Sequence, residues 1–311
     1  MNNRSLKPKW CGNLVDAHRH GLYDISCEWS LAGVAVEDWS ANSKFLAHER
    51  RTKSLFGTDL HDALHPWIEY SRNEGVGTVL DFSGKHASSD VQCVYGLYGV
   101  RLKPTVFWST WREDVMPSSE VMILPDEREI GPDVAEVARS FLTANPEGII
   151  TLHAGESEAR TKIGKARLGL SIVEWLAMES LLDSRTLLVH ANTMASKDFG
   201  LIEDSGAGVV MCPLTRLALI NPVPKVPQRV RVFFGTDAPL VSGSRSLIAQ
   251  ALAEAELWVL FGYTKIAAAE RAAIALMRPL TGEQREDTAM TTDLAGFLFS
   301  CLIKERYHDC N

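Results

Sequence analysis

Short apolar runs rich in β-branched residues recur along this chain, and longer segments of mixed polarity separate them. Runs of roughly four to eight such residues predict buried strands, and their alternation with helical segments is typical of βα units. We interpret eight runs as strands: NLVDA (13–17), GVGTVLDF (75–82), GVRLKPTVFW (99–108), EVMILP (120–125), GIITLH (148–153), RTLLVH (185–190), AGVVMC (207–212) and VRVFFGTD (230–237).

Several of the intervening segments carry apolar residues at helical spacing. They predict amphipathic helices at HDALHPWIEYSRNE (61–74), GPDVAEVARSFLTANP (131–146), GLSIVEWLAMESLL (169–182) and RSLIAQALAEAELWVLFGY (245–263). Eight strands with helices between them favour an α/β fold, a single (β/α)8 TIM-type barrel over residues 1–311. Residues 281–311 are then a C-terminal packing segment. A doubly wound open sheet gives a similar alternation and stays open as the alternative.

Composition limits the classes of partner. The 311 residues include 46% hydrophobic and 23% charged residues, so a large core is expected. A net charge of −7 argues against nucleic acid or an anionic membrane and leaves a small-molecule substrate as the expected partner, with a homo-oligomer possible. The six cysteines form no CxxC pair, and no apolar run approaches the roughly 18 residues of a membrane span. We expect reduced thiols in a cytoplasmic protein.

Polar residues that bind metals end several of the predicted strands. His18 and His20 leave the same face of the first strand, His153 and His190 end two later ones, and Asp237 ends the last. In a barrel the carboxyl ends of the strands meet on one face, so these side chains converge. Each residue alone has an ordinary alternative, such as helix capping by Asp237. Together, imidazoles and a carboxylate predict a Zn²⁺ site.

The motifs VDAHRH, TLHAGE, LLVHAN and FFGTDAP together resemble those of the amidohydrolase superfamily of metal-dependent hydrolases. HAGE and TDAP are similar to the adenosine deaminase branch, whereas ESLLDSRTLLVHANTM and MCPLTR are closer to the cytosine deaminase and triazine chlorohydrolase branch. The resemblance implies one Zn²⁺ per chain, with Fe²⁺ or Mn²⁺ as possible replacements. It implies this ligand set: His18, His20, His153 and Asp237. Asp237 also counts among the catalytic residues that the resemblance implies, with His190 beside the attacking water and Glu156 facing the substrate.

Some positions depart from the family pattern. Binuclear members use a carboxylated lysine at the end of strand four, which this chain lacks, so we favour a mononuclear site. Asp126 or Glu127 as a bridge to a second ion is the alternative. Ala238 replaces a second aspartate of adenosine deaminases, which puts adenosine in doubt. We expect no flanking β-sandwich domain.

Glu156 lies three residues after His153, where a carboxyl group could pass a proton to a ring nitrogen. This favours deamination of a small nitrogenous heterocycle. Hydrolysis of an amide, a cyclic amide or a carbon–halogen bond by the same site is the alternative, and a ligand-binding barrel without catalysis is the rival from another class. Helix capping is the alternative for Glu156. The candidates for substrate binding are Trp108, Arg216 and His86, with rim packing and a solvated arginine as the alternatives for the first two.

Overall fold

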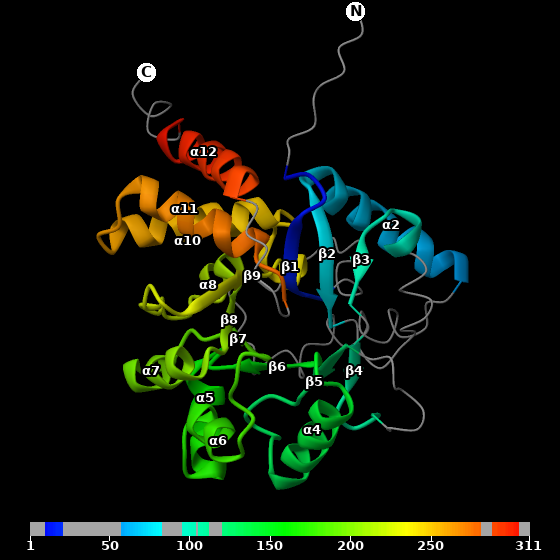
Figure 1. The fold of residues 1–311 in the computed structure, drawn as a ribbon, viewed down its shortest axis with the longest axis vertical. Coiled ribbons are helices and arrows are strands. Elements are labelled where there is room, and N and C mark those ends of the chain that lie inside the picture. The colour runs from blue at the N-terminus through cyan, green and yellow to red at the C-terminus, as the bar shows by residue number, and fades with distance from the viewer. Residues whose placement is uncertain are drawn as a thin grey trace, which may run out of the picture.

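The structure is a computed structural model that describes residues 10–20, 57–82, 95–103, 105–111, 120–280 and 288–304, without the side chains of residues 57, 58 and 304. Within these ranges all strands belong to one parallel sheet, and helices surround it (Figure 1). The strands are β1 (Leu14–Arg19), β2 (Val76–Asp81), β3 (Arg101–Leu102), β4 (Thr105–Phe107), β5 (Val121–Ile123), β6 (Ile149–Ala154), β7 (Thr186–His190), β8 (Gly208–Met211) and β9 (Arg231–Phe234).

The order of the strands shows how the sheet curls. It runs β3-β2-β1-β9-β8-β7-β6-β5-β4, and β3 and β4 at its two ends are separated in the chain only by residues 103 and 104. Both lie in the third predicted strand, so each of the eight predicted strands is confirmed and one is divided. Residue 104 is a proline, which has no N–H to donate to a neighbouring strand. This cyclic order is consistent with a TIM-type barrel, whereas a doubly wound sheet reverses its order midway.

The first and last strands pair with each other at Asp16 and Phe234. The Asp16 carboxylate accepts hydrogen bonds from Thr236 N at 3.0 Å and from Thr236 Oγ1 at 2.7 Å, across 220 positions of sequence. Both residues are fully buried. This contact fixes the carboxyl ends of β1 and β9 against each other, directly before His18 and Asp237.

The helices pack around the outside of the sheet (Figure 1). They are α2 (Gly57–Glu74), α4 (Pro132–Ala144), α5 (Glu158–Leu168), α6 (Ile172–Met178), α7 (Ser196–Ser205), α8 (Pro213–Ala218), α9 (Pro239–Ser242), α10 (Leu247–Leu260), α11 (Lys265–Met277) and α12 (Thr288–Lys304). All four predicted helices are present, although α6 ends at Met178, short of the predicted end at Leu182. The expected C-terminal packing helix is α12.

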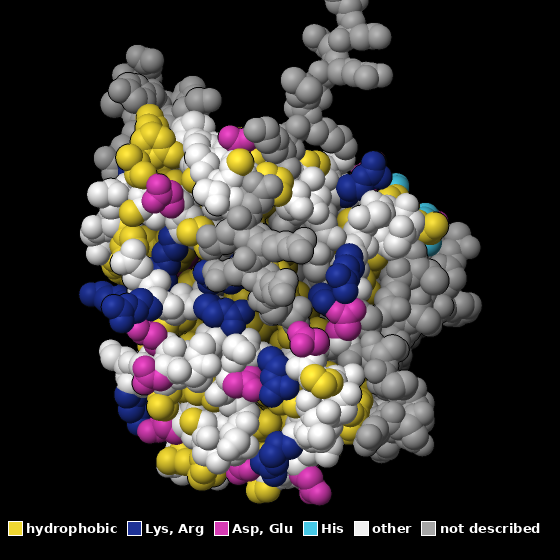
Figure 2. Space-filling view, in the orientation of Figure 1, with side chains coloured by type: hydrophobic (Ala, Val, Ile, Leu, Met, Phe, Trp, Pro, Cys, Tyr) yellow, Lys and Arg dark blue, Asp and Glu magenta, His cyan; other side chains and the backbone are white. Residues whose placement is uncertain are grey.

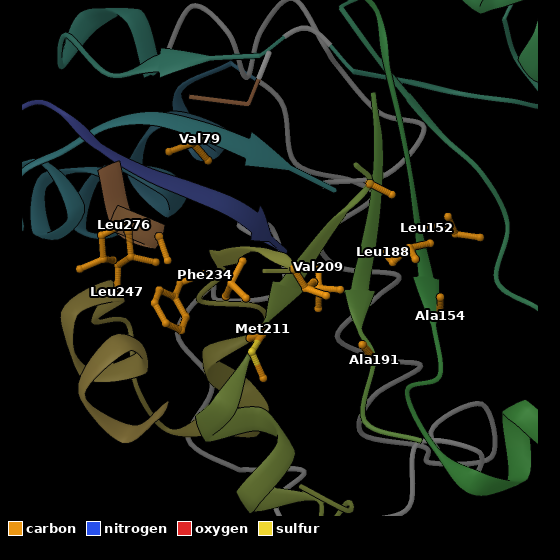
Figure 3. Packing of buried hydrophobic residues seen from close by; sticks show 14 of the residues in the cluster. Val79, Leu152, Ala154, Leu188, Ala191, Val209, Met211, Phe234, Leu247 and Leu276 are labelled. Carbon is orange, nitrogen blue, oxygen red and sulfur yellow. The ribbon is translucent and has the colours of Figure 1, made fainter. Parts of the chain in front are cut away.

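Two apolar clusters lie on opposite faces of the sheet, because alternate residues of a strand point to opposite sides. The inner cluster includes Val15, Phe82, Val189 and Phe233. The larger outer cluster lies between the sheet and the helices; Figure 3 shows members from the strands together with Leu247 of α10 and Leu276 of α11. Cys212 belongs to the inner cluster, as expected for a core residue, and burial raises the pKa of its thiol well above the usual value.

The surface carries charges of both signs. On the face in Figure 2, Lys and Arg side chains are interspersed with Asp and Glu side chains, and no broad area of one sign is visible. None of the helices in the described residues is both long and apolar enough to cross a bilayer. In the same residues Cys11, Cys212 and Cys301 are free thiols, while the remaining cysteines lie outside the described ranges.

Candidate metal centre and active site

Four imidazoles and one carboxylate lie together at the carboxyl ends of the strands. His18 Nε2 lies 3.3 Å from His153 Nε2 and 3.4 Å from Asp237 Oδ1, and His20 Nε2 lies 3.7 Å from the same oxygen. A tetrahedral ion with bonds of about 2.1 Å separates its ligand atoms by roughly 3.4 Å. The spacing of these four side chains therefore fits one divalent ion.

The fifth group, His190, lies at the same centre. Possible ligand atoms form two overlapping groups, each within 4.8 Å: His18, His20 and His153, and His18, His190 and Asp237. The His190 ring lies 5.2 Å from that of His153 and 5.7 Å from that of His18, between ring centroids. The structure thus brings together the whole set of strand-end residues that the sequence predicts to converge.

Backbone contacts hold these side chains in place. Asp237 N donates to His18 O at 3.0 Å, and His20 N donates to Asp237 O at 3.1 Å. Gly235 permits this approach, because a Cβ there would lie 2.7 Å from both Cβ and O of His18. On the other side, Ala154 pairs with His190 in the parallel register of β6 and β7. Each of these side chains is therefore fixed by the strand that carries it and by the neighbouring strand.

Strained backbone is concentrated at this centre. His190, Ala191 and Asp237 have φ values of 78°, 56° and 57°, in the left-handed region that residues other than glycine rarely adopt. Such conformations cost on the order of 1–3 kcal/mol each and persist where surrounding structure imposes them. The chain turns sharply at these points, directly where each strand ends.

The protonation states suit metal binding. Burial, and next the charge of His18, lower the pKa of His20 to about 3. Burial also lowers the pKa of His190 to about 3 and that of His153 well below its usual value. Burial alone would raise the pKa of Asp237, but the hydrogen bond from His18 and the surrounding imidazoles bring it far below the usual range. At neutral pH the His20, His153 and His190 imidazoles are neutral and the Asp237 carboxylate is ionised, as ligation of a metal requires.

Phe82 forms an apolar wall of the centre. Its ring lies edge-on to that of His18 at 4.3 Å and 5.5 Å from that of His153, between centroids. Phe82 is 4% exposed and directly follows β2. It had no assigned role in the sequence, because one phenylalanine after a strand gives no signal of its own. It limits access of water to His18 from the side of β2.

Glu156 lies beside the imidazoles and is held by several contacts. Its Oε2 lies 3.9 Å from His190 Nε2 and accepts a hydrogen bond from Arg160 Nη1, and its backbone carbonyl accepts one from Asn192 Nδ2 at 3.0 Å. Glu156 precedes Ser157, whose hydroxyl accepts from Arg160 N and caps α5. Ser157 therefore caps this helix, and the Glu156 side chain faces His190. Neither Arg160 nor Asn192 was identified as functional from the sequence.

Comparisons with known proteins point in the same direction. No protein-family profile matches this chain. A stretch of 117 residues is 30% identical to a 5-methylthioadenosine/S-adenosylhomocysteine deaminase of Archaeoglobus fulgidus and covers 36% of this chain and 28% of that protein. This chain therefore matches less than a third of the length of that relative.

Solved structures with bound zinc share the fold. An adenosine deaminase from Xanthomonas campestris has a TM-score of 0.67 and 18% identity, over 85% of this chain and 66% of that one. An atrazine chlorohydrolase from Arthrobacter aurescens has a TM-score of 0.68 and 14% identity, over 92% of this chain and 71% of that one. The chain resembles the amidohydrolase superfamily in fold as well as in motif. The resemblance inferred from the sequence is confirmed.

Two carboxylates were the candidates for a second ion of the kind that binuclear members of the amidohydrolase superfamily bind. Asp126 instead pairs with Arg128, at 2.6 Å between Oδ2 and Nη2, and lies 3.4 Å from Arg160 Nη1. Glu127 Oε1 accepts hydrogen bonds from Gly155 N at 3.3 Å and from Thr161 Oγ1 at 3.1 Å. Burial raises the pKa of Glu127 to about 7. Both carboxylates thus have protein partners, and neither belongs to a ligand group of the described residues.

Trp108 packs on the outer side of the sheet, against the cluster beneath the helices. Strand alternation explains this position, because Val106 faces the outer cluster and Phe107 the inner one. Phe107 is therefore the aromatic residue of this segment that faces the barrel interior. The predicted stacking of Trp108 on a substrate ring stays a prediction, and its packing agrees with the structural alternative.

Arg216 is buried on α8. Its Nη2 donates to Glu254 Oε2 of α10 at 2.6 Å, and the two side chains are 1% and 0% exposed. The alternative of a solvated loop arginine is wrong, because the side chain joins two helices in the interior. The predicted substrate contact of Arg216 stays a prediction, with a protein carboxylate as the observed partner. His86 lies outside the described residues.

Proposed function

We propose that this protein is a mononuclear zinc-dependent hydrolase that deaminates a small nitrogenous heterocycle. The observation that carries the proposal is the convergence of three histidines and one aspartate from three strands, at spacings that fit one ion. Its ligands are His18, His20, His153 and Asp237, and Fe²⁺ or Mn²⁺ could replace Zn²⁺ in the same donor set. Zinc in two structures of the same fold supports this choice of metal.

The residues around the ion then have separate tasks. An ion in this site supplies an activated water at neutral pH. His190, which lies beside Asp237 and whose Nε2 is 3.9 Å from Glu156 Oε2, orients that water and accepts a hydrogen bond or a proton from it. Deamination adds water to a ring carbon, delivers a proton to the adjacent ring nitrogen and releases ammonia. Glu156 would carry that proton, because its carboxylate lies beside His190, just beyond the carboxyl end of β6.

The relatives support deamination more than the alternative. The stretch that is 30% identical belongs to a deaminase, as does one of the zinc-bound structures. Cleavage of a carbon–halogen bond, or of an amide or cyclic amide, is the second candidate; the likeness to an atrazine chlorohydrolase favours the first of these. Ala238 argues against adenosine itself as the substrate.

The wider setting of this activity is also a proposal. One (β/α)8 barrel over residues 1–311 carries the site, with residues 281–311 as its C-terminal packing segment. The net charge of −7 and the scattered cysteines support a cytoplasmic enzyme that acts on a small molecule and binds no nucleic acid or membrane. The cyclic strand order supports the barrel.

Release of ammonia tests the function directly. Metal-replete protein is incubated with purines, pyrimidines, pterins and aminotriazines, and chloride release from a chlorotriazine is followed in parallel. Protein carrying Asp237→Asn, prepared in the same way, controls for contaminating enzymes. Ammonia release by wild type alone supports the deaminase, and chloride release alone supports the second candidate. If neither product exceeds that of the Asp237→Asn control, the proposed function is wrong.

A further inference from the structure

Arg160 belongs to a buried row of charges that reaches the site from the end of β5. The row alternates in sign: Arg128, Asp126, Arg160 and Glu156. Arg160 Nη1 donates to Glu156 Oε2 and lies 3.4 Å from Asp126 Oδ2. The side chains of Asp126, Arg160 and Glu156 are 11%, 11% and 7% exposed. Ion pairs with this little exposure are screened much less than surface pairs.

The backbone that carries Arg160 is fixed before its side chain makes these contacts. Its N–H donates to the hydroxyl of Ser157, the N-cap of α5, at 3.2 Å. Arg160 lies in the first turn of this helix, and Glu156 lies just before its N-cap, where the ion pair joins the two side chains. Asp126 is held in turn by the backbone N–H and the guanidinium of Arg128, at 2.9 Å and 2.6 Å. The guanidinium of Arg160 is therefore clamped from two directions.

The consequence concerns the orientation of Glu156. The oxygen that accepts from Arg160 is also the oxygen that lies 3.9 Å from His190 Nε2. Rotation of the carboxylate away from His190 would break the contact with Arg160 and leave two buried charges apart. The backbone of Glu156 is fixed separately, by Asn192 Nδ2 on its carbonyl at 3.0 Å. Main chain and side chain are thus held by different elements.

We infer that Arg160 is a positioning residue, which holds the Glu156 carboxylate in the orientation that proton transfer needs, and that Asp126 fixes Arg160 in turn. The inference rests on the proposed function for the role of Glu156 and adds a residue whose direct contact with the site is through that carboxylate. Arg160 makes no contact with the four proposed metal ligands in the described contacts. A displacement of about 1 Å at a reacting group can lower a rate about 10²-fold, so this positioning has a measurable effect.

A double-mutant cycle tests the inference. Arg160→Gln should lower kcat about 10²-fold, with a smaller change in KM and with zinc content retained. In a Glu156→Gln background the same substitution should have at most a small further effect on kcat, because its direct contact with the site is already lost. Lys165→Gln, at an exposed position of the same helix, is the matched control and should match wild type. Unchanged kcat in Arg160→Gln, or losses that multiply in the double variant, would overturn the inference.

Two further measurements keep the test decisive. If Arg160→Gln does not fold, Arg160→Lys takes its place in the cycle; it keeps the charge but loses the planar fork, and kcat should fall by about tenfold or more. If no substrate is found and the proposed function fails, crystal structures of wild type and the Arg160 variant still test whether Arg160 positions the Glu156 carboxylate. A Glu156 carboxylate that moves away from His190 supports positioning, and one that stays in place contradicts it.

Discussion

His61 and His65 on α2 stack with ring centroids 5.7 Å apart and an interplanar angle of 16°, much as His153 and His190 do at 5.2 Å and 18°. The two pairs differ in their surroundings. The side chains of His61 and His65 are 36% and 41% exposed on one helix, whereas that of His190 is 2% exposed. His153 and His190 come from two strands and meet a carboxylate that follows a third. Proximity of imidazoles is therefore insufficient; burial, neutral rings and an ionised carboxylate make the candidate metal centre.

The largest expected effect separates the two pairs directly. His153→Ala removes one of four proposed ligands, so bound zinc should fall from about one ion per chain to near zero. Turnover should fall by more than the roughly 10²–10⁴-fold that loss of an acid–base group costs. His65→Ala should keep both values at the wild-type level. Elemental analysis and the product assay measure these outcomes; about two ions in wild type would contradict a mononuclear site.

The next largest effect is expected for His190→Asn, which tests whether His190 binds the metal or orients the water. If His190 orients the water and four other residues hold the ion, this variant should retain zinc and lose about 10²–10⁴-fold in turnover. Zinc content and kcat are measured on the same preparation. Loss of zinc would instead make His190 a ligand and extend the metal set to all five strand-end residues.

Glu156→Gln should lower kcat at least about 10²-fold without a change in zinc content. Glutamine keeps the size of the side chain but cannot deliver a proton and recover it. A weaker substrate affinity with kcat intact would assign Glu156 to substrate binding and favour the second candidate function. Steady-state kinetics against the best substrate, together with a melting curve, distinguish these results.

The smallest effect compares two carboxylates by stability. The pKa of Glu127 is raised to about 7, mainly by burial, so the native state holds its proton more tightly than the unfolded state. Its stabilising contribution is therefore present below pH about 4.5 and is lost as pH rises to about 7, on the order of 3 kcal/mol. In Glu127→Gln this contribution is absent, so the free energy of unfolding should fall less between pH 5 and pH 8 than it does in wild type. Urea denaturation at several pH values measures this difference.

Glu174 is the control for that comparison. It is partly exposed, and the Lys197 ammonium with the N–H of Ser171 lowers its pKa to about 2. Its contribution is therefore lost only as pH falls below about 4.5, outside the tested range. Glu174→Gln should leave the slope between pH 5 and 8 as in wild type. An unchanged slope in Glu127→Gln as well would mean that Glu127 is ionised throughout.

The sequence predicts those features that depend on local pattern. All eight apolar runs contain strands, and the convergence of His18, His153 and Asp237 follows because parallel strands place their carboxyl ends on one face. The helix α5 was missed because its buried residues, Arg160 and Gly164, give no apolar pattern at helical spacing. Ser180, with φ of 58°, lies in the segment where α6 was wrongly extended.

The sequence does not predict contacts between distant segments. The pairing of Arg216 with Glu254 joins positions 38 residues apart, and no local pattern indicates that the guanidinium turns inward. Trp108 and Phe107 are equally apolar neighbours, and the exact register of a short strand decides which one faces the interior. Arg160 is a further case, because α5 was not predicted and Glu156 lies before its first residue, so a spacing of four alone did not indicate the ion pair.

The contact between Asp16 and Thr236 has a kinetic consequence. It spans 220 positions, and pairings of such long separation slow the folding of a chain because a large loop must close before any contact compensates. His18 and Asp237 meet only when this pairing forms, so the ligand set is incomplete in any intermediate with an open sheet. A metal that binds only the closed sheet would trap it by mass action. We therefore expect zinc added during refolding to raise the yield of native protein.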